Sequence, residues 1–171
     1  DANATVISLD LDESSLKSQA SKYSNLVLKF TSHVVDVSNE AQVKDAISKV
    51  QDTYGRIDGL INCAGIQTYG SVVDTTEETW DRTFNVNVKS MFLTAKHAAP
   101  MMIAQKSGSI VNISSVQSLM SQKTVVAYAA SKGAINSLTR ASAIDLAIDN
   151  VRVNAILPGS VDTPMLRKSA D

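Results

Sequence analysis

The sequence predicts an α/β fold, in which a doubly wound parallel sheet carries helices on both faces. Short apolar runs bounded by turn residues alternate with longer segments whose apolar residues recur at helical spacing. Strands that alternate with helices form parallel sheets, because each helix carries the chain back to the start of the next strand. Several apolar runs end in polar residues or glycine, and such sheets bind ligands outside the carboxyl ends of their strands.

The first part of the chain predicts three strands and two helices. The predicted strands are residues 5–10, a short segment around Val34 and Val35 that ends at Asp36, and residues 57–62. The predicted helices are residues 13–23 and 39–53, and Ser38 can cap the second of them. The expected buried side of that second helix consists of Ala41, Val43, Ala46, Ile47 and Val50.

The rest of the chain predicts a long helical region, then a strand, a helix and a strand. The helical region begins at Thr75 or Thr76 and reaches about Gln105, and Pro100 should kink or loosen its last turns. Apolar residues recur along it at helical spacing: Trp80, Phe84, Val88, Phe92 and Ala95. The later elements are a strand at 110–114, a helix at 124–148 and a strand at 152–157.

Composition narrows the class of protein. A chain of 171 residues suits one domain with a sizeable core, and 44% apolar with 19% charged residues is typical of a soluble globular protein. The net charge of −1 gives no electrostatic reason to expect nucleic acid or an anionic membrane as a partner. A single cysteine fits a reducing compartment, and no apolar run approaches the ~20 residues of a membrane span. We therefore expect a cytoplasmic location.

Tyr128 and Lys132 are the most informative pair, because side chains four residues apart on a helix point the same way. An ammonium within about 4–6 Å of a phenol favours the phenolate, which proton-transfer chemistry needs near neutral pH. The same spacing also occurs in many helices as a packed ring beside a solvated amine. The neighbouring pattern favours chemistry: Ser115 follows one apolar strand, and Pro158-Gly159 follows another, at the same expected sheet edge.

Six motifs then occur in one order along the chain. They are Asp36-Val37, Asn62-Cys63-Ala64-Gly65, Asn87, Ser115, Tyr128-x-x-x-Lys132 and Pro158-Gly159-x-Val161-x-Thr163. In this the chain resembles the short-chain dehydrogenase/reductases, and the resemblance runs from about residue 5 to 165. It implies a Rossmann-like fold and an NAD(P)-dependent oxidoreductase that interconverts a secondary alcohol and a ketone.

The resemblance also assigns catalytic roles. Tyr128 would be the general acid/base, and Lys132 would assist it and bind the nicotinamide ribose. Ser115 would bond the substrate oxygen, although satisfying a strand end is the commoner fate of such a serine. Asn87, favoured over Asn85 by its spacing to Phe92, would hold a water in a relay to Lys132; bonding a local carbonyl is its alternative role.

The cofactor expectation is NAD, with NADP less favoured. Asp10 ends a predicted strand, where a carboxylate bonds the ribose 2′-OH and repels a 2′-phosphate, and Leu11 supplies no cation beside it. The alternative for Asp10 is a solvated loop carboxylate. Asp36, with Val37, would lie near the adenine, and a turn or cap role for Asp36 is the alternative. The other cofactor contacts that the resemblance implies are Asn62, Ala64, Gly65, Ile113, Tyr128, Lys132, Pro158, Gly159, Val161 and Thr163.

Substrate contacts are expected from Ser115, Tyr128, Gln117 and Gln122, and with Met165 these hint at a polar alcohol or sugar. Some other residues are assigned structural roles. Cys63, which replaces the second Asn of the family motif, is expected to be a small buried hydrophobe. His33 and His97 lack partners at metal-ligand spacing, so no metal site is expected, and Trp80 fits a core or subunit interface.

The glycine-rich turn that opens such folds, Thr-Gly-x-x-x-Gly-x-Gly in this family, does not occur in the sequence. We therefore expect residues 1–171 to form a single Rossmann-type domain that is incomplete at both ends, its central first strand and its C-terminal end apparently missing. A shortened family member is the alternative. The rival function is a catalytically silent fragment or scaffold that binds no dinucleotide.

Assembly is expected from the two long helices at 76–105 and 124–148, which carry more apolar and small residues than one side of a sheet needs. In the family the matching helices pair across two-fold axes, so the resemblance implies a homodimer or homotetramer.

Overall fold

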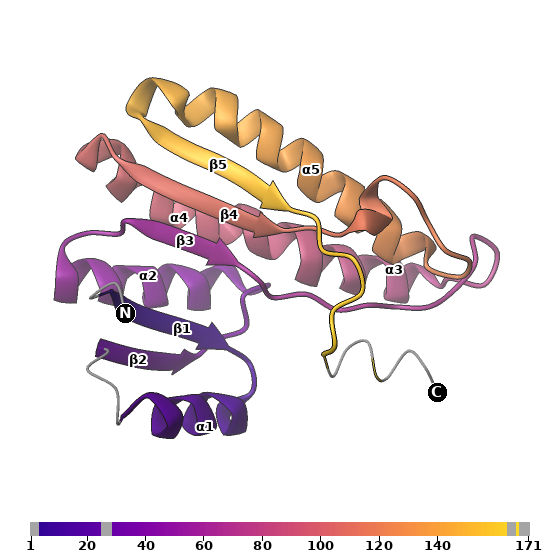
Figure 1. Cartoon of the computed structure of the whole chain (residues 1–171), viewed down its shortest axis with the longest axis horizontal. Coiled ribbons are helices and arrows are strands. Elements are labelled where there is room, and N and C mark those ends of the chain that lie inside the picture. Colours follow the sequence, from indigo (N-terminus) through magenta and orange to yellow (C-terminus); the bar gives the residue numbers. More distant parts are fainter. Residues whose placement is uncertain (1–3, 25–28, 164–166, 168–171) are drawn as a thin grey trace.

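The computed structural model describes residues 4–24, 29–163 and 167, in which strands and helices alternate as predicted (Figure 1). The strands are β1 (Thr5–Asp10), β2 (Lys29–Val34), β3 (Gly59–Asn62), β4 (Gly108–Ile113) and β5 (Val151–Ile156). The longer helices are α1 (Glu13–Ser24), α2 (Glu40–Tyr54), α3 (Glu77–Phe84), α4 (Ser90–Gln105) and α5 (Val126–Leu146). Three short helical turns are η1 (Asn85–Lys89), η2 (Val116–Ser118) and η3 (Ala147–Asp149).

All strand pairing in the described residues is parallel, which confirms the predicted α/β class. β1 pairs with β2, and β3, β4 and β5 form a second sheet with β4 in the middle. In this part of the chain β1 and β3 do not pair with each other, so the strands form two sheets. Their arrows point the same way in Figure 1, so the carboxyl ends gather at one end of the molecule.

A common apolar core joins the two sheets through α2 and α4. Val43 and Ile47 of α2 pack with Leu93 of α4, and partly buried Leu9 and Leu60 contact this cluster from β1 and β3. A second cluster packs Met102 of α4 against the β4–β5 pair and reaches α5; its buried members are Met102, Ile110, Val151 and Val153. The helices α2, α4 and α5 therefore hold the strands in place from one side.

The start of α2 differs from the sequence prediction. Asn39, and not Ser38, is its N-cap: the Asn39 side chain accepts a hydrogen bond from the Gln42 amide. The Ser38 hydroxyl instead donates to the Asp36 carboxylate at 2.6 Å. Ala41 was expected on the buried side but is exposed, because it lies in the first turn, ahead of the first core residue Val43.

Two further elements differ in extent. β2 begins at Lys29 and ends at Val34; apart from Phe30, its residues before Val34 are polar and none is fully buried, so apolarity alone marked only its end. The predicted helix to Gln105 is divided into α3, the π-helical turn η1 and α4, while Pro100 is accommodated within α4. π-Turns inside helices are rare and frequently mark functional sites, and this one contains Asn87.

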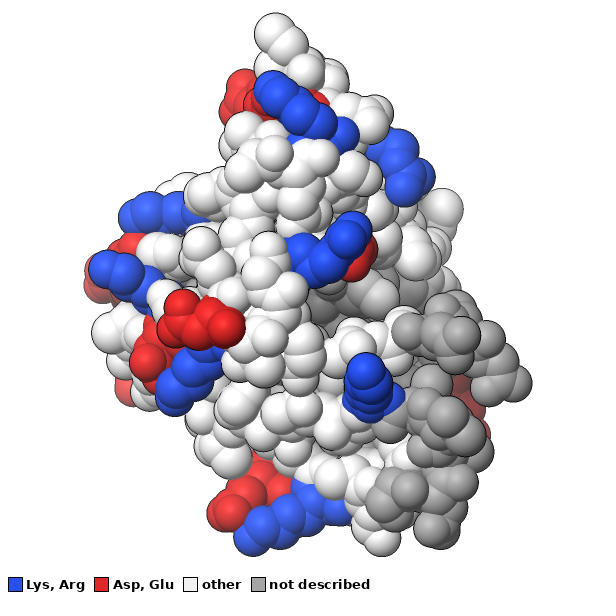
Figure 2. Space-filling model, turned by 90° about the vertical axis from the view of Figure 1, so that its left-hand side faces the viewer, with Lys and Arg blue, Asp and Glu red and all other residues white. Residues whose placement is uncertain are grey.

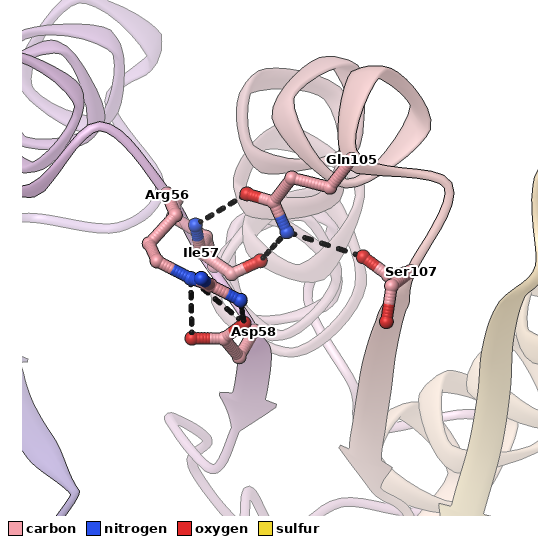
Figure 3. A network of polar contacts seen from close by, with 5 residues as sticks. All are labelled: Arg56, Ile57, Asp58, Gln105 and Ser107. Carbon is pink, nitrogen blue, oxygen red and sulfur yellow. Dashed lines mark hydrogen bonds and ion pairs between the residues drawn. The ribbon is translucent and has the colours of Figure 1, made fainter.

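The amino end of β3 is fixed by the polar network of Figure 3. The Gln105 side chain accepts from the Ile57 amide and donates to the Ile57 carbonyl, both at 2.9 Å. Arg56 makes a bidentate ion pair with Asp58 beside it. Figure 2 shows the face at this end of the molecule, where described residues of both charge signs are interspersed. The described part of that face therefore has no large patch of a single charge sign.

Candidate active site

The carboxyl ends of β3 and β4, the turn η1 and the first half of α5 meet at one place. The Lys132 ammonium donates to the Ile113 carbonyl at the end of β4, at 2.9 Å. Ser114, the residue after Ile113, donates its hydroxyl to the Lys132 carbonyl at 3.0 Å. These two bonds tie the end of β4 to the helix that carries the predicted Tyr–Lys pair.

Tyr128 and Lys132 lie one turn apart in α5, as the spacing predicts, and both are buried. The Lys132 Nζ lies 5.5 Å from the centroid of the Tyr128 ring. Burial removes water from the Lys132 amine and so disfavours its charged form. Burial lowers the pKa of Lys132 to about 8, while the neighbouring Cys63 opposes this change. The amine therefore still carries its proton at neutral pH.

Asn87 is completely buried and uses its whole side-chain amide. Its Oδ1 accepts from the Ile66 amide at 2.8 Å, and its Nδ2 donates to the Ile66 carbonyl at 2.9 Å and to the Ser131 hydroxyl at 3.0 Å. Both amide hydrogens are thus committed. A water held here would bond the remaining lone pair of Oδ1 or the backbone of the π-turn.

Gly65 lies between these groups. A Cβ added to it would be 3.3 Å from the Asn87 Oδ1 and 3.7 Å from the Lys132 Nζ. Backbone without a side chain is therefore in close contact with two of the predicted catalytic residues. Glycine at this position therefore allows the close packing of backbone against Asn87 and Lys132 that a larger residue would disturb.

Ser115 is buried directly after the end of β4 and caps the short turn η2, where its hydroxyl accepts from the Gln117 amide at 3.2 Å. The loop that follows is closed by Gln117, whose Oε1 accepts from the Gln122 amide. The loop's end is paired to Gly70, which donates to the Thr124 carbonyl at 2.7 Å. The loops after β3 and β4 are thereby fastened together in front of α5.

The comparisons with known proteins bear on this arrangement. The family model for "short chain dehydrogenase" matches residues 1–171. The chain belongs to the short-chain dehydrogenase family. It is 41% identical over 165 residues to the 3-oxoacyl-[acyl-carrier-protein] reductase FabG of Thermotoga maritima, covering 96% of this chain and 67% of that protein.

Solved structures of short-chain dehydrogenases have the same fold as this chain. A gluconate 5-dehydrogenase from Burkholderia cenocepacia, in complex with NADP and tartrate, is 33% identical with a TM-score of 0.92, covering 98% of this chain and 66% of that one. An NAD+-bound xylitol dehydrogenase is 32% identical with a TM-score of 0.92, covering 96% and 64%. The chain thus spans about two thirds of the length of these family members.

The residues that the family resemblance assigns to the cofactor lie along the same strand ends. Asp10 and Leu11 are exposed after β1, and the Asp10 carboxylate accepts from the Asp12 amide at 3.0 Å. The Asp36 carboxylate accepts from the amide and hydroxyl of Ser38, which stabilises the turn after β2. A contact of Asp36 with the adenine stays a prediction. Val37 packs against the α2–α4 core.

The remaining positions follow β3 and β5. Asn62 is buried with its side chain bonded inside the protein, whereas Ala64 is exposed. The Pro158 carbonyl accepts from the Val116 amide, which joins the two strand ends. Gly159 and Val161 are exposed, and Thr163 is half-buried. Met165, expected near the substrate, lies outside the described residues.

Cys63 corrects one expectation, because it is exposed and not a buried hydrophobe. Side chains alternate along the end of β3: Ile61 is exposed and Asn62 is buried, so the next residue, Cys63, faces the exposed side again. Trp80 stacks on Phe84 at 4.7 Å and is only partly covered, and His97 bonds Glu40 at 3.2 Å. Among the described residues no three His, Cys, Asp or Glu side chains are grouped for a metal ion.

The sequence reasoning missed Ser114, Ser131 and Ile66, which connect the predicted residues. Ser131 is fully buried, donates to the Tyr128 carbonyl at 2.7 Å and accepts from Asn87. A signal existed in the hydroxyl placed between Tyr128 and Lys132, on the side of the helix that these two residues share. Ile66 contributes only its backbone, so its side chain could not have indicated the role.

Proposed function

We propose that the protein is an NAD(P)-dependent oxidoreductase that interconverts a secondary alcohol and a ketone. The observation that carries this is the buried Tyr128–Lys132 pair at the strand ends, where Lys132 is anchored to Ile113 and Ser115 follows in the same segment. A buried phenol beside an ammonium can exchange a proton with a substrate hydroxyl.

Each residue has a defined task. In alcohol oxidation the Tyr128 phenolate accepts the hydroxyl proton, while the Lys132 ammonium stabilises the negative phenolate. The Ser115 hydroxyl bonds the substrate oxygen, and Asn87 holds Ile66 and α5 in place and supports proton supply. In ketone reduction the same proton returns from Tyr128 to the oxygen. Lys132 would also hold the ribose of a bound nicotinamide, which would supply the hydride acceptor for alcohol oxidation and the hydride donor for ketone reduction.

The fit of a dinucleotide is supported by the position of Gly65 after β3, where its backbone lies close to the Lys132 amine and the Asn87 amide without a side chain between them. We favour NAD over NADP because Asp10 is an exposed carboxylate at the end of β1 with apolar Leu11 beside it. A 2′-phosphate there would meet like charge. The ratio of kcat/KM for the two cofactors measures this preference, and a preference for NADP would contradict it.

Assembly as a homodimer or homotetramer is the accompanying proposal. Phe92 of α4 is 48% exposed, Ile144 of α5 is 78% exposed and Ile148 in η3 is 88% exposed, so apolar surface remains on the long helices. Light scattering on the purified protein tests it, and a purely monomeric mass would contradict it. No helix in the described ranges is long and apolar enough to cross a bilayer. A cytoplasmic location remains a proposal.

The direct test is NADH titration of the purified protein of verified intact mass, followed by turnover with secondary alcohols and polyols. The proposal expects saturable NADH binding and oxidation of at least one alcohol. The polar substrate suggested by Gln117 and Gln122 predicts that polyols are preferred over simple alkanols. Absence of dinucleotide binding would favour the rival reading, a catalytically silent protein on this fold.

A further inference from the structure

A line of four buried polar side chains crosses the molecule beneath the candidate site. The Thr94 hydroxyl donates to the Asn62 Oδ1 at 2.7 Å, and the Asn62 Nδ2 donates to the Asn112 Oδ1 at 2.9 Å. The Asn112 Nδ2 donates to the Thr139 hydroxyl at 2.9 Å. The Thr139 hydroxyl ends the line by donating to the Ile135 carbonyl at 2.8 Å. We call these four residues the polar ladder.

The two asparagines each accept from one neighbour in the ladder and donate to the next. The hydroxyls at both ends also contact backbone carbonyls of their own helices, those of Ser90 and Met91 for Thr94 and that of Ile135 for Thr139. All four members are at most 7% exposed. Asn62 and Asn112 are direct cross-strand partners in the β3–β4 register, so their contact is possible in this register only. Apolar side chains could fill the same space with comparable stability, but they would not fix a register or an orientation in this way.

Each member lies in an element that carries a residue of the candidate site or directly adjoins the segment that does. Thr94 lies in α4, about two helical turns beyond Asn87. Asn62 closes β3 just before Gly65, and Asn112 precedes Ser115 in the β4 segment. Thr139 lies in α5, about two turns beyond Lys132. The ladder therefore connects the four elements whose relative placement determines the geometry of the site.

We propose that the polar ladder is a positioning device that holds β4 against α5, so that the Ile113 carbonyl meets the Lys132 ammonium and Tyr128 faces Ser115. Its members touch no reacting group, so they are positioning residues. The catalytic consequence rests on the proposed function, whereas the placement of Lys132 does not. Loosening the β4–α5 contact should separate Lys132 from Ile113 and admit water around the amine.

The test removes one hydroxyl from the ladder in the full-length protein. Thr139→Val keeps the shape of the side chain but leaves the Asn112 amide without its acceptor. Thr139→Ser retains the hydroxyl and should restore function. Thr83→Val is the matched control, because Thr83 is also buried in a helix and donates to the carbonyl four residues earlier, that of Thr79, at 2.6 Å. Its hydroxyl also bonds the Thr68 hydroxyl at 2.8 Å, so valine removes one further polar partner here too, but outside the ladder.

Two measurements separate positioning from mere stability. The first is kcat per folded enzyme at 25 °C: Thr139→Val should lower it by ~10-fold or more with little change in KM for the cofactor, since small misplacements are costly. Thr139→Ser and Thr83→Val should stay within about threefold of the wild type. The second is the titration of Lys132, followed by NMR in lysine-labelled protein. The titratable side chains that face it in the described structure are Tyr128 and Cys63.

In the wild type the titration of Lys132 should lie near 8, and in Thr139→Val it should move up toward the ordinary value of 10.5. Unchanged kcat and unchanged titration in Thr139→Val would overturn the proposal, as would an equal loss of kcat in Thr83→Val. A wild type without any turnover, combined with a displaced Lys132 titration in Thr139→Val, would refute the proposed function and support the ladder. If Thr139→Val does not fold, Thr94→Val removes the donor at the other end and undergoes the same measurements.

Discussion

The side chain of Asn87 makes two hydrogen bonds to the backbone of Ile66, accepting from its amide and donating to its carbonyl. We call this pair of bonds a clamp. Gln105 holds Ile57 in the same way at the other end of β3. Both amides come from the helical region η1–α4, so β3 is fastened at each end by one side chain from the helix that packs beside it. Only the Asn87 clamp reaches α5, through Ser131.

This pair of clamps predicts a difference between two matched substitutions. Asn87→Asp replaces the donor to Ile66 and Ser131 by a buried carboxylate oxygen, so it should cost about 1–3 kcal/mol of unfolding free energy or more. It should also lower kcat by at least ~10-fold, because Tyr128 and Lys132 lose their link to the β3 end. Gln105→Glu breaks the equivalent clamp far from the site. Urea unfolding and kcat of both variants test this, and an equal kcat loss would refute it.

Removing the phenol hydroxyl tests the assigned general acid/base. Tyr128→Phe should lower turnover by ~10²–10⁴-fold, since the proton would have to pass to water without a positioned partner. The buried ring is kept, so the unfolding free energy should change little. Tyr54→Phe is the control, because its hydroxyl contacts only the exposed Thr31 among the described bonds. Near-normal turnover of Tyr128→Phe would contradict the assignment of Tyr128 as the general acid/base.

Local periodicity was enough to predict most of the fold. The apolar runs of β4 and β5 and the buried stripe of α2 were visible, because burial on one side imposes a period on the residues themselves. The division of the long helix at Asn85–Lys89 was not, since a π-turn depends on contacts of Asn87 with distant Ile66 and not on helix propensity. β2 was placed too late because Thr31, Ser32 and His33 are polar, so the apolar signal began only at Val34.

The candidate site was predictable to the extent that single residue types signal chemistry. Tyr128, Lys132, Ser115 and Asn87 were recognised by motif, and the structure gathers their elements at one edge. The connecting residues were missed, because Ser131 and Asn112 act through partners 44 and 27 residues away. Cys63 was misjudged because residue preference was used where the alternation of buried and exposed side chains along the end of β3 determines exposure.

A methyl group at Gly65 should damage the site with little effect on the fold. The Cβ of Gly65→Ala would be 3.3 Å from the Asn87 Oδ1. The Asn87 side chain cannot easily yield, because one hydrogen bond to its Oδ1 and two from its Nδ2 hold it in place. We expect kcat/KM for the cofactor to fall by ~10-fold or more. Gly133→Ala in α5 is the control, since nothing lies within 4 Å of its added Cβ. That variant should gain about 0.5–1 kcal/mol in stability, as alanine favours a helix interior.

The buried amine of Lys132 predicts a rise in stability at alkaline pH. Its pKa is lowered by burial to about 8 in the folded protein, below the ordinary value of 10.5 in the unfolded chain. Between these two values the unfolded state binds more protons than the folded state, so the unfolding free energy increases with pH. Below about pH 8 both states are protonated and the unfavourable burial of charge is fully present. Across the window the gain is about 3 kcal/mol at most.

The measurement is urea unfolding of the wild type and of Lys132→Met at a series of pH values from 7 to 10.5. Methionine keeps the length and apolar stem of the side chain without its charge, so the other titrating groups are common to both proteins. The difference between the two unfolding free energies should favour Lys132→Met at pH 7 and shrink steadily as the pH rises through 8. A difference that stays constant over this range would show that the Lys132 amine is not desolvated in the folded protein, and the electrostatic basis for its role beside Tyr128 would have to be abandoned.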